Sequence, residues 1–154
     1  GEIYFQKPLL VRWTTNPPHK ELLVVADKLI WQYFPDEELA YKYPVAVVDE
    51  KNAFLRVLFG LSSLEDGFEI SVLPAEDKLS KLKLEPFEPS ASLLEATLWL
   101  EPYSATIRRL AITDFYGNIS EIRMTKLTFN PVIPAQTFSF TPPEGTEIED
   151  RTKQ

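Results

Sequence analysis

Short apolar runs and turn residues alternate along most of the chain at the spacing of β-hairpins. Pro, Asn, Asp and Gly cluster between the runs, as in Asn16-Pro17-Pro18 and Tyr116-Gly117-Asn118. Because consecutive strands follow one another without helices, the pattern predicts an antiparallel meander. The expected strands are Glu2–Gln6, Leu9–Thr14, Glu21–Ala26, Lys28–Phe34, Glu37–Tyr43, Phe68–Leu73, Leu79–Glu85, Leu93–Leu100, Thr106–Asp114, Ile119–Phe129 and Thr137–Thr141.

The centre of the chain has a helical pattern instead. Asn52 can cap a helix over Ala53–Phe59, and a second short helix over Ser63–Asp66 has the spacing of a capping box. Four apolar residues recur at the i, i+3, i+4, i+7 positions of one helical face. This predicted apolar face consists of Phe54, Val57, Leu58 and Leu61.

Two of the expected strands are apolar on both faces, namely Leu22–Val25 and Leu29–Phe34. An antiparallel strand of this kind needs a cover on each side, which a second sheet, a helix or a ligand can provide. The chain has many strands and only one good pair of helices to cover them. The pattern therefore fits a sheet that curls around a lined interior, and a β-sandwich with an ordinary packed core is the open alternative.

Large aromatic residues lie where the opening of such a cavity is expected. Trp13 and Trp31 each lie on a strand next to a proline turn, where a large ring can fill a core or line a cavity. Side chains two residues apart on a strand share a face. We therefore expect the inward side of the early strands to line a cavity through Val11, Trp13, Trp31 and Tyr33.

Composition and net charge exclude several classes of chain and of binding partner. The 154 residues suffice for one ordinary domain, and 44% hydrophobic with 25% charged residues exclude a disordered or fibrous chain. The 23 acidic side chains outnumber the 16 basic ones, for a net charge of −7. This balance argues against a nucleic-acid partner and against binding to anionic lipid through charge. No run is long and apolar enough to span a bilayer.

Residues for catalysis are sparse. The only histidine, His19, lies in a proline turn, and there is no cysteine. The five glycines are never adjacent, so no phosphate-binding loop is expected, and nothing singles out a pair of carboxylates. One histidine without cysteine also removes most metal-site arrangements. The residues thus predict no enzyme, no metal and no cofactor.

Several stretches, in order, resemble the family of the periplasmic lipoprotein carrier LolA. The motif that ends the chain, with two phenylalanines before Pro142-Pro143, is the most specific of them. Together they make the resemblance extend over nearly the whole chain. The stretches are Gly1–Trp13, Ala26–Pro35, Asp114–Asn118, Asn130-Pro131 and Phe138–Ile148.

The resemblance implies a mainly β fold, an unclosed antiparallel β-barrel with a helical lid over a hydrophobic cavity. It implies a non-enzymatic, monomeric carrier in the periplasm that shields lipoprotein acyl chains. Such a carrier takes its cargo from an inner-membrane LolCDE-type ABC transporter and delivers it to the outer-membrane receptor LolB. The helix Ala53–Phe59 would belong to the lid. Lys7 falls where the family commonly has an arginine that holds the lid closed, and lysine lacks the planar fork of that arginine.

The resemblance also implies one LolA-like domain over residues 1–154, with a first helix and two strands of the family fold preceding Gly1. The closest alternative is the outer-membrane receptor of similar fold, which is lipidated on an N-terminal cysteine. A lipid- or lipoprotein-sensing regulatory domain of the same fold is a second alternative, and an enzyme is the third.

Overall fold

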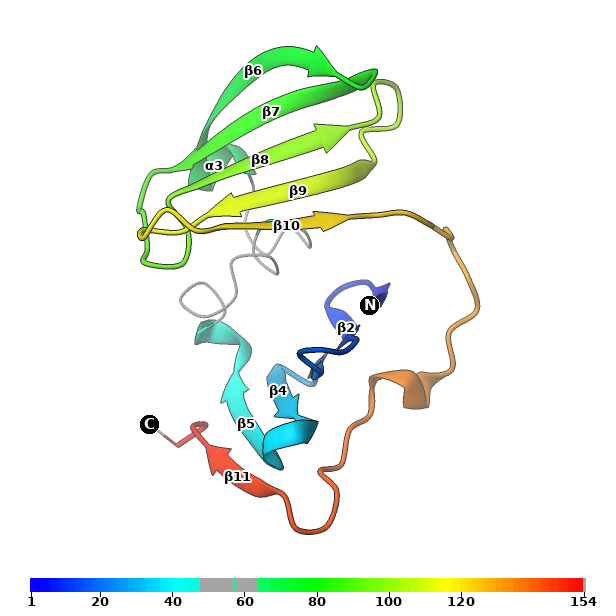
Figure 1. The fold of residues 1–154 in the computed structure, drawn as a ribbon. Coiled ribbons are helices and arrows are strands. Elements are labelled where there is room, and N and C mark those ends of the chain that lie inside the picture. The colour runs from blue at the N-terminus through cyan, green and yellow to red at the C-terminus, as the bar shows by residue number, and fades with distance from the viewer. Residues whose placement is uncertain (48–56, 58–63, 154) are drawn as a thin grey trace. The chain divides into compact units, whose positions relative to one another are not determined.

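The computed structural model describes residues 1–47, 57 and 64–153. The chain forms two compact units, one made of Gly1–Val47 with Asn130–Gln154 and the other of Val48–Phe129 (Figure 1). We call them unit 1 and unit 2. Each unit contains one β-sheet, and the described part of the chain is mostly strand.

Unit 1 is a six-stranded sheet in the order β1-β2-β3-β4-β5-β11. The first five strands pair antiparallel along the chain, as the meander prediction requires. Two single turns of 3-10 helix follow β4 and β5, at Pro35–Glu37 and Val45–Val47. The strands are β1 (Glu2–Gln6), β2 (Leu10–Thr15), β3 (Glu21–Ala26), β4 (Leu29–Phe34), β5 (Leu39–Pro44) and β11 (Glu147–Asp150).

The hairpin between β3 and β4 fixes the register of this sheet. Asp27 and Lys28 both have positive φ, at 51° and 62°, as the two central residues of a type I′ turn do. A two-residue turn leaves no slack, so Ala26 pairs with Leu29 and Val24 pairs with Trp31. This register decides which side chains share a face.

The C-terminal part of unit 1 differs from the sequence prediction. Thr137–Thr141 is not a strand, because Ala135–Phe138 forms the 3-10 turn η3 and the residues after it pair with no strand. Prolines on both sides of this segment remove the N–H donors that a sheet ladder needs. The acidic stretch Glu147–Asp150 forms β11, a mostly exposed edge strand that pairs parallel to β5.

Unit 2 is a five-stranded antiparallel sheet in the order β10-β9-β8-β7-β6. The short helix α3, Leu64–Gly67, leads into β6 close to where Ser63–Asp66 was predicted. The strand β10 ends well before the predicted Phe129. The strands are β6 (Phe68–Glu76), β7 (Leu79–Pro86), β8 (Glu95–Leu100), β9 (Ile107–Thr113) and β10 (Ile119–Arg123).

The sheet of unit 2 has one apolar and one charged face. Its apolar face forms the core of the unit, in which Leu84, Leu98 and Leu110 are almost completely buried. The charged face carries Lys81 and Arg109 on the two strands beside Trp99.

The predicted mainly β fold is confirmed. In the described part of the chain neither sheet closes on itself, because β1 and β11 are the edges of one and β10 and β6 are the edges of the other. The predicted helix Ala53–Phe59 lies outside the described residues except for Val57, which is helical.

Candidate functional site

The register of unit 1 divides its side chains between two faces. Trp13 pairs with Leu23, and Leu23 pairs with Gln32, so these three side chains lie on the same side of the sheet. Trp31 pairs with Val24 and therefore points to the opposite side. We name the two sides the Val11 face and the Trp31 face.

The Val11 face is an apolar surface that crosses five strands. Val11, Val25 and Ile30 are at most 1% exposed, and Leu23 and Tyr43 are also buried. The partly buried Ile3, Phe5 and Trp13 extend the same surface to the edge strand β1. By alternation and register, its members are Ile3, Phe5, Val11, Trp13, Leu23, Val25, Ile30 and Tyr43.

One end of the Val11 face is polar. The Gln32 Nε2 donates a hydrogen bond of 2.6 Å to Glu21 Oε1, and the Tyr43 hydroxyl donates one of 3.2 Å to Gln32 Oε1. Burial, reinforced by the negative charge of Glu21, raises the pKa of Tyr43 to about 12. The phenol is therefore a neutral hydrogen-bond donor at physiological pH, and the apolar surface ends in a defined polar row.

The Trp31 face is covered by the chain itself. The Phe140 ring lies 5.6 Å from the ring of Trp31 and 5.5 Å from that of Tyr33, centroid to centroid. The turn η3 packs against β2 and β3, and Arg12 Nη1 donates to the Thr137 carbonyl at 3.3 Å. Because residues 130–141 lie on this side of the sheet, the Val11 face is the side of unit 1 that its own C-terminal segment leaves to other groups.

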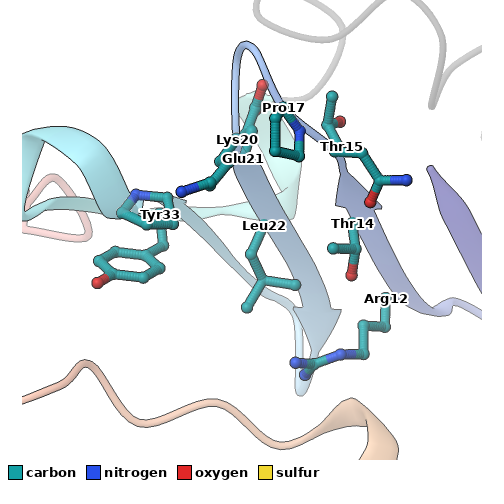
Figure 2. A pocket seen from close by; sticks show the side chains of 10 residues that line it. Arg12, Thr14, Thr15, Pro17, Lys20, Glu21, Leu22 and Tyr33 are labelled. Carbon is teal, nitrogen blue, oxygen red and sulfur yellow. The ribbon is translucent and has the colours of Figure 1, made fainter.

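Two shallow hollows remain on the Trp31 face. One, of about 300 Å³, is lined in part by Arg12, Leu22 and Tyr33 (Figure 2). The other, of about 220 Å³, lies between the strands and the C-terminal segment at Val24 and Phe138. The first hollow lies beside the turn after β2 and is lined by no residue of the C-terminal segment, whereas Phe138, Ser139 and Phe140 of that segment line the second.

The residues predicted for the cavity do not form one surface. Val11 and Trp13 lie on the Val11 face, whereas Trp31 and Tyr33 lie on the Trp31 face against Phe140. The prediction that all four line the same side of the sheet is therefore wrong, because the hairpin register places the two pairs on opposite faces. Contact of Val11 and Trp13 with acyl chains stays a prediction.

The structure describes only some of the residues predicted for the lid. Val57 is 3% exposed and belongs to the core of unit 2 together with Phe68 and Leu110. Lys7 is exposed in the turn between β1 and β2. Phe54, Leu58 and Leu61 lie outside the described residues, so the contact predicted between Lys7 and a lid stays a prediction.

Sequence reasoning missed Gln32, Glu21 and Phe140. The first two are polar residues inside strands that read as apolar, and only the register shows that they lie on one face. Phe140 belonged to a predicted strand, Thr137–Thr141, which the structure does not form. The two-residue Asp27-Lys28 turn is the signal that could have assigned the faces.

Comparison with known proteins places the chain in a family. Residues 1–141 match the family described as outer membrane lipoprotein carrier protein LolA. The chain belongs to the LolA family. Relatives named outer-membrane lipoprotein carrier protein include one from Bordetella pertussis, 29% identical over 150 residues that cover 96% of this chain and 69% of the relative.

Other relatives are about as similar. A protein of Azotobacter vinelandii named outer-membrane lipoprotein carrier protein is 28% identical over 151 residues, which cover 96% of this chain and 70% of the relative. A solved structure described as an outer membrane lipoprotein-sorting protein domain from Vibrio parahaemolyticus has 12% identity and a TM-score of 0.43, over 79% of this chain and 63% of that one.

The described residues hold no group of three or more His, Cys, Asp or Glu side chains that could bind a metal ion. No helix in this part of the chain is long and apolar enough to cross a membrane.

Proposed function

We propose that this LolA-family chain is a periplasmic carrier that holds the acyl chains of lipoproteins on the Val11 face of unit 1. Family membership over residues 1–141 is the observation that carries the carrier function. The choice of face is supported by the unbroken apolar surface from β1 to β5 and by the C-terminal segment, which covers the other side.

The physical need for such a surface is large. Each acyl methylene removed from water contributes about 0.8 kcal/mol, so lipoprotein acyl chains cross an aqueous compartment only when shielded. A carrier also has to release its cargo, which an apolar surface without directional contacts allows better than a tightly complementary pocket does. The cargo would come from an inner-membrane ABC transporter and go to an outer-membrane receptor. The transporter would supply the energy, so the carrier itself is proposed to need no nucleotide.

Neighbouring residues on β2 offer a matched test of the face. Trp13 is partly buried on the Val11 face, and Thr14 is exposed on the Trp31 face. We expect Trp13→Glu to weaken binding of a fluorescent triacylated lipopeptide at least about tenfold, because it places a charge on the apolar surface. Thr14→Glu adds the same charge one residue away and should leave binding unchanged.

Val11→Glu should also weaken binding, but Val11 is fully buried, so this variant loses more stability than Trp13→Glu. Circular dichroism and urea unfolding of each variant separate loss of binding from loss of folding. Normal lipopeptide binding by a folded Trp13→Glu protein would show that the acyl chains do not use the Val11 face. Absence of binding by the unaltered protein would contradict the carrier function itself.

A further inference from the structure

The polar end of the Val11 face continues onto the last strands of unit 1. Gln32 pairs with Tyr41 on β5, and Tyr41 pairs with Glu149 on β11, so these three side chains lie on one side of the sheet. The Arg151 guanidinium lies 4.6 Å from the centre of the Tyr41 ring, on the same side. We call this set of side chains the polar corner. It consists of Glu21, Gln32, Tyr41, Tyr43, Glu149 and Arg151.

The polar corner is more open to solvent than the apolar part of the same face. Val11, Val25 and Ile30 are at most 1% exposed. The side chains of Glu149 and Arg151, in contrast, are 42% and 35% exposed. A ligand that has both hydrocarbon chains and a polar group would therefore bury its chains on the apolar part and place its polar group at the corner.

The hydrogen bonds of Gln32 fix the orientation of its amide. A carboxylate can only accept hydrogen bonds, so the Gln32 nitrogen donates to Glu21 at 2.6 Å and the Gln32 oxygen accepts from the Tyr43 hydroxyl at 3.2 Å. Within the described residues Gln32 Nε2 has no second acceptor. One N–H of this oriented amide can therefore donate to a carbonyl of a bound ligand.

The polar corner carries an excess of negative charge. Glu149 is neutralised by Arg151, which donates to it at 2.7 Å. Glu21 forms no ion pair with any residue that the structure describes, and the neighbouring Lys20 pairs instead with Asp36 at 3.3 Å. The Glu21 carboxylate is therefore a fixed negative charge beside the apolar surface, and it would repel an anionic group placed there.

We propose that the polar corner selects the cargo by its polar part: it binds the uncharged ester and amide groups that carry the acyl chains and rejects the anionic headgroups of phospholipids. This inference rests on the proposed function. Acyl chains of lipoproteins and of phospholipids have the same chemistry, so an apolar surface alone does not distinguish them. Specificity needs a repulsive element as well as an attractive one. Glu21 provides the repulsion, and the free N–H of Gln32 provides the hydrogen bond.

Two competitors with identical chains test the selection. Dioctanoylglycerol is uncharged and dioctanoyl phosphatidylglycerol is anionic, and each displaces the fluorescent triacylated lipopeptide from the protein. We expect the unaltered protein to bind dioctanoylglycerol at least about tenfold more tightly than the anionic lipid. Added salt should reduce this preference, because it screens the repulsion by Glu21.

Substitutions that remove one negative charge test the origin of this preference. Glu21→Gln keeps an acceptor for Gln32 and should lower the preference at least about fivefold. Glu149→Gln leaves Arg151 without its partner and should lower it in the same direction, on an edge strand where little stability is at risk. Glu2→Gln is the matched control, because Glu2 pairs with Thr14 on the Trp31 face, and it should leave the preference unchanged.

Gln32→Met tests the attractive part of the selection. Methionine has a similar length but no N–H donor, so binding of dioctanoylglycerol should weaken at least about threefold. Circular dichroism of each variant confirms that it is folded. Unchanged binding of dioctanoylglycerol by folded Gln32→Met would contradict the hydrogen bond to the ligand.

The remaining outcomes keep this inference apart from the carrier function. Selection by the polar corner is overturned if the unaltered protein binds both competitors equally, or if Glu2→Gln lowers the preference as much as Glu21→Gln does. It is also overturned if folded Glu21→Gln and Glu149→Gln proteins keep the full preference. In each of these cases the lipopeptide still binds and the carrier function stands. A protein that binds no lipopeptide at all contradicts the carrier function, and the selection with it.

Discussion

In this LolA-family protein the two sheets differ in whether one face or both faces are apolar and buried. In unit 2 the strands alternate, with Leu98 on the core side and Trp99 under the charged side chains of Lys81 and Arg109. In unit 1 the consecutive residues Val24 and Val25 are 2% and 1% exposed although they point to opposite faces. The sheet of unit 2 thus needs one apolar cover, and the sheet of unit 1 needs two.

This difference indicates where apolar surface is available for function. The guanidinium of Arg109 lies 3.9 Å from the centre of the Trp99 ring and Lys81 lies 5.2 Å from it, so charged side chains cover this ring. In unit 1 the C-terminal segment covers the Trp31 face. The Val11 face is buried as well, because Val11, Val25 and Ile30 are at most 1% exposed. Acyl chains could therefore reach this apolar surface only when its cover moves.

The largest expected effect concerns the cover of the Trp31 face. Phe138 is 5% exposed, and replacing it by Ala should lower the free energy of unfolding by about 3 kcal/mol, because a buried ring is lost and its site cannot fully collapse. Lys83→Ala on the charged face of unit 2 removes only partly exposed ion pairs and should change the free energy of unfolding by less than about 1 kcal/mol. Urea unfolding measures the stability of both variants. Equal effects would contradict the difference between the sheets.

The second effect concerns the polar end of the Val11 face. Burial raises the pKa of Tyr43 to about 12, against 10.0 for the ordinary phenol. As pH rises, the phenol of Tyr43 is therefore deprotonated at a lower pH in the unfolded chain than in the folded protein. The stabilisation that the neutral, buried phenol provides is complete below pH 10 and is lost as pH rises from 10 to 12. The loss should reach about 2–3 kcal/mol in the free energy of unfolding. Unfolding curves from pH 9 to 12 measure it, and Tyr43→Phe should abolish this component. An identical pH profile in both proteins would contradict it.

The third effect separates the two faces with one kind of substitution. Val24→Thr and Val25→Thr each place a hydroxyl in a buried site and should each lower the free energy of unfolding by about 1–2 kcal/mol. Only Val25 lies on the Val11 face, so only Val25→Thr should weaken lipopeptide binding, by up to about tenfold. Fluorescence titration measures the binding. A weaker affinity in Val24→Thr alone would assign the acyl chains to the Trp31 face.

Local patterns predicted most of the strands because each depends on neighbours in sequence. Glu2–Gln6 and Glu21–Ala26 were predicted with the observed bounds, and the need for two covers followed from the apolar run before Asp27. The separation of Trp13 from Trp31 was missed, because spacing within each strand leaves open which faces of two strands coincide. Register provides that link, and the two-residue turn at Asp27-Lys28 determines it for β3 and β4.

Contacts distant in sequence account for the other misses. Nothing near Glu147–Asp150 indicates that it pairs parallel to β5, because parallel pairing depends on where the chain returns. The polar row at one end of the Val11 face joins Glu21, Gln32 and Tyr43 from three strands, and each alone reads as an ordinary strand residue. The sequence therefore predicted that unit 1 has apolar strand faces, but it did not predict which side chains share a face.

The smallest expected effect concerns a feature that the two sheets share. Lys28 and Lys78 have positive φ, at 62° and 63°, in two-residue Asp-Lys turns. This conformation strains a residue with a Cβ by about 1 kcal/mol. Glycine relieves the strain but adds entropy to the unfolded chain, so Lys28→Gly and Lys78→Gly should each raise the free energy of unfolding by about 0.5 kcal/mol. Alanine keeps the Cβ, so the corresponding alanine variants should show no gain. Similar stability gains in both glycine variants would show that the two turns are equivalent and that the sheets differ in their faces. A gain in only one variant would show that the surrounding sheet also affects the stability of its turn.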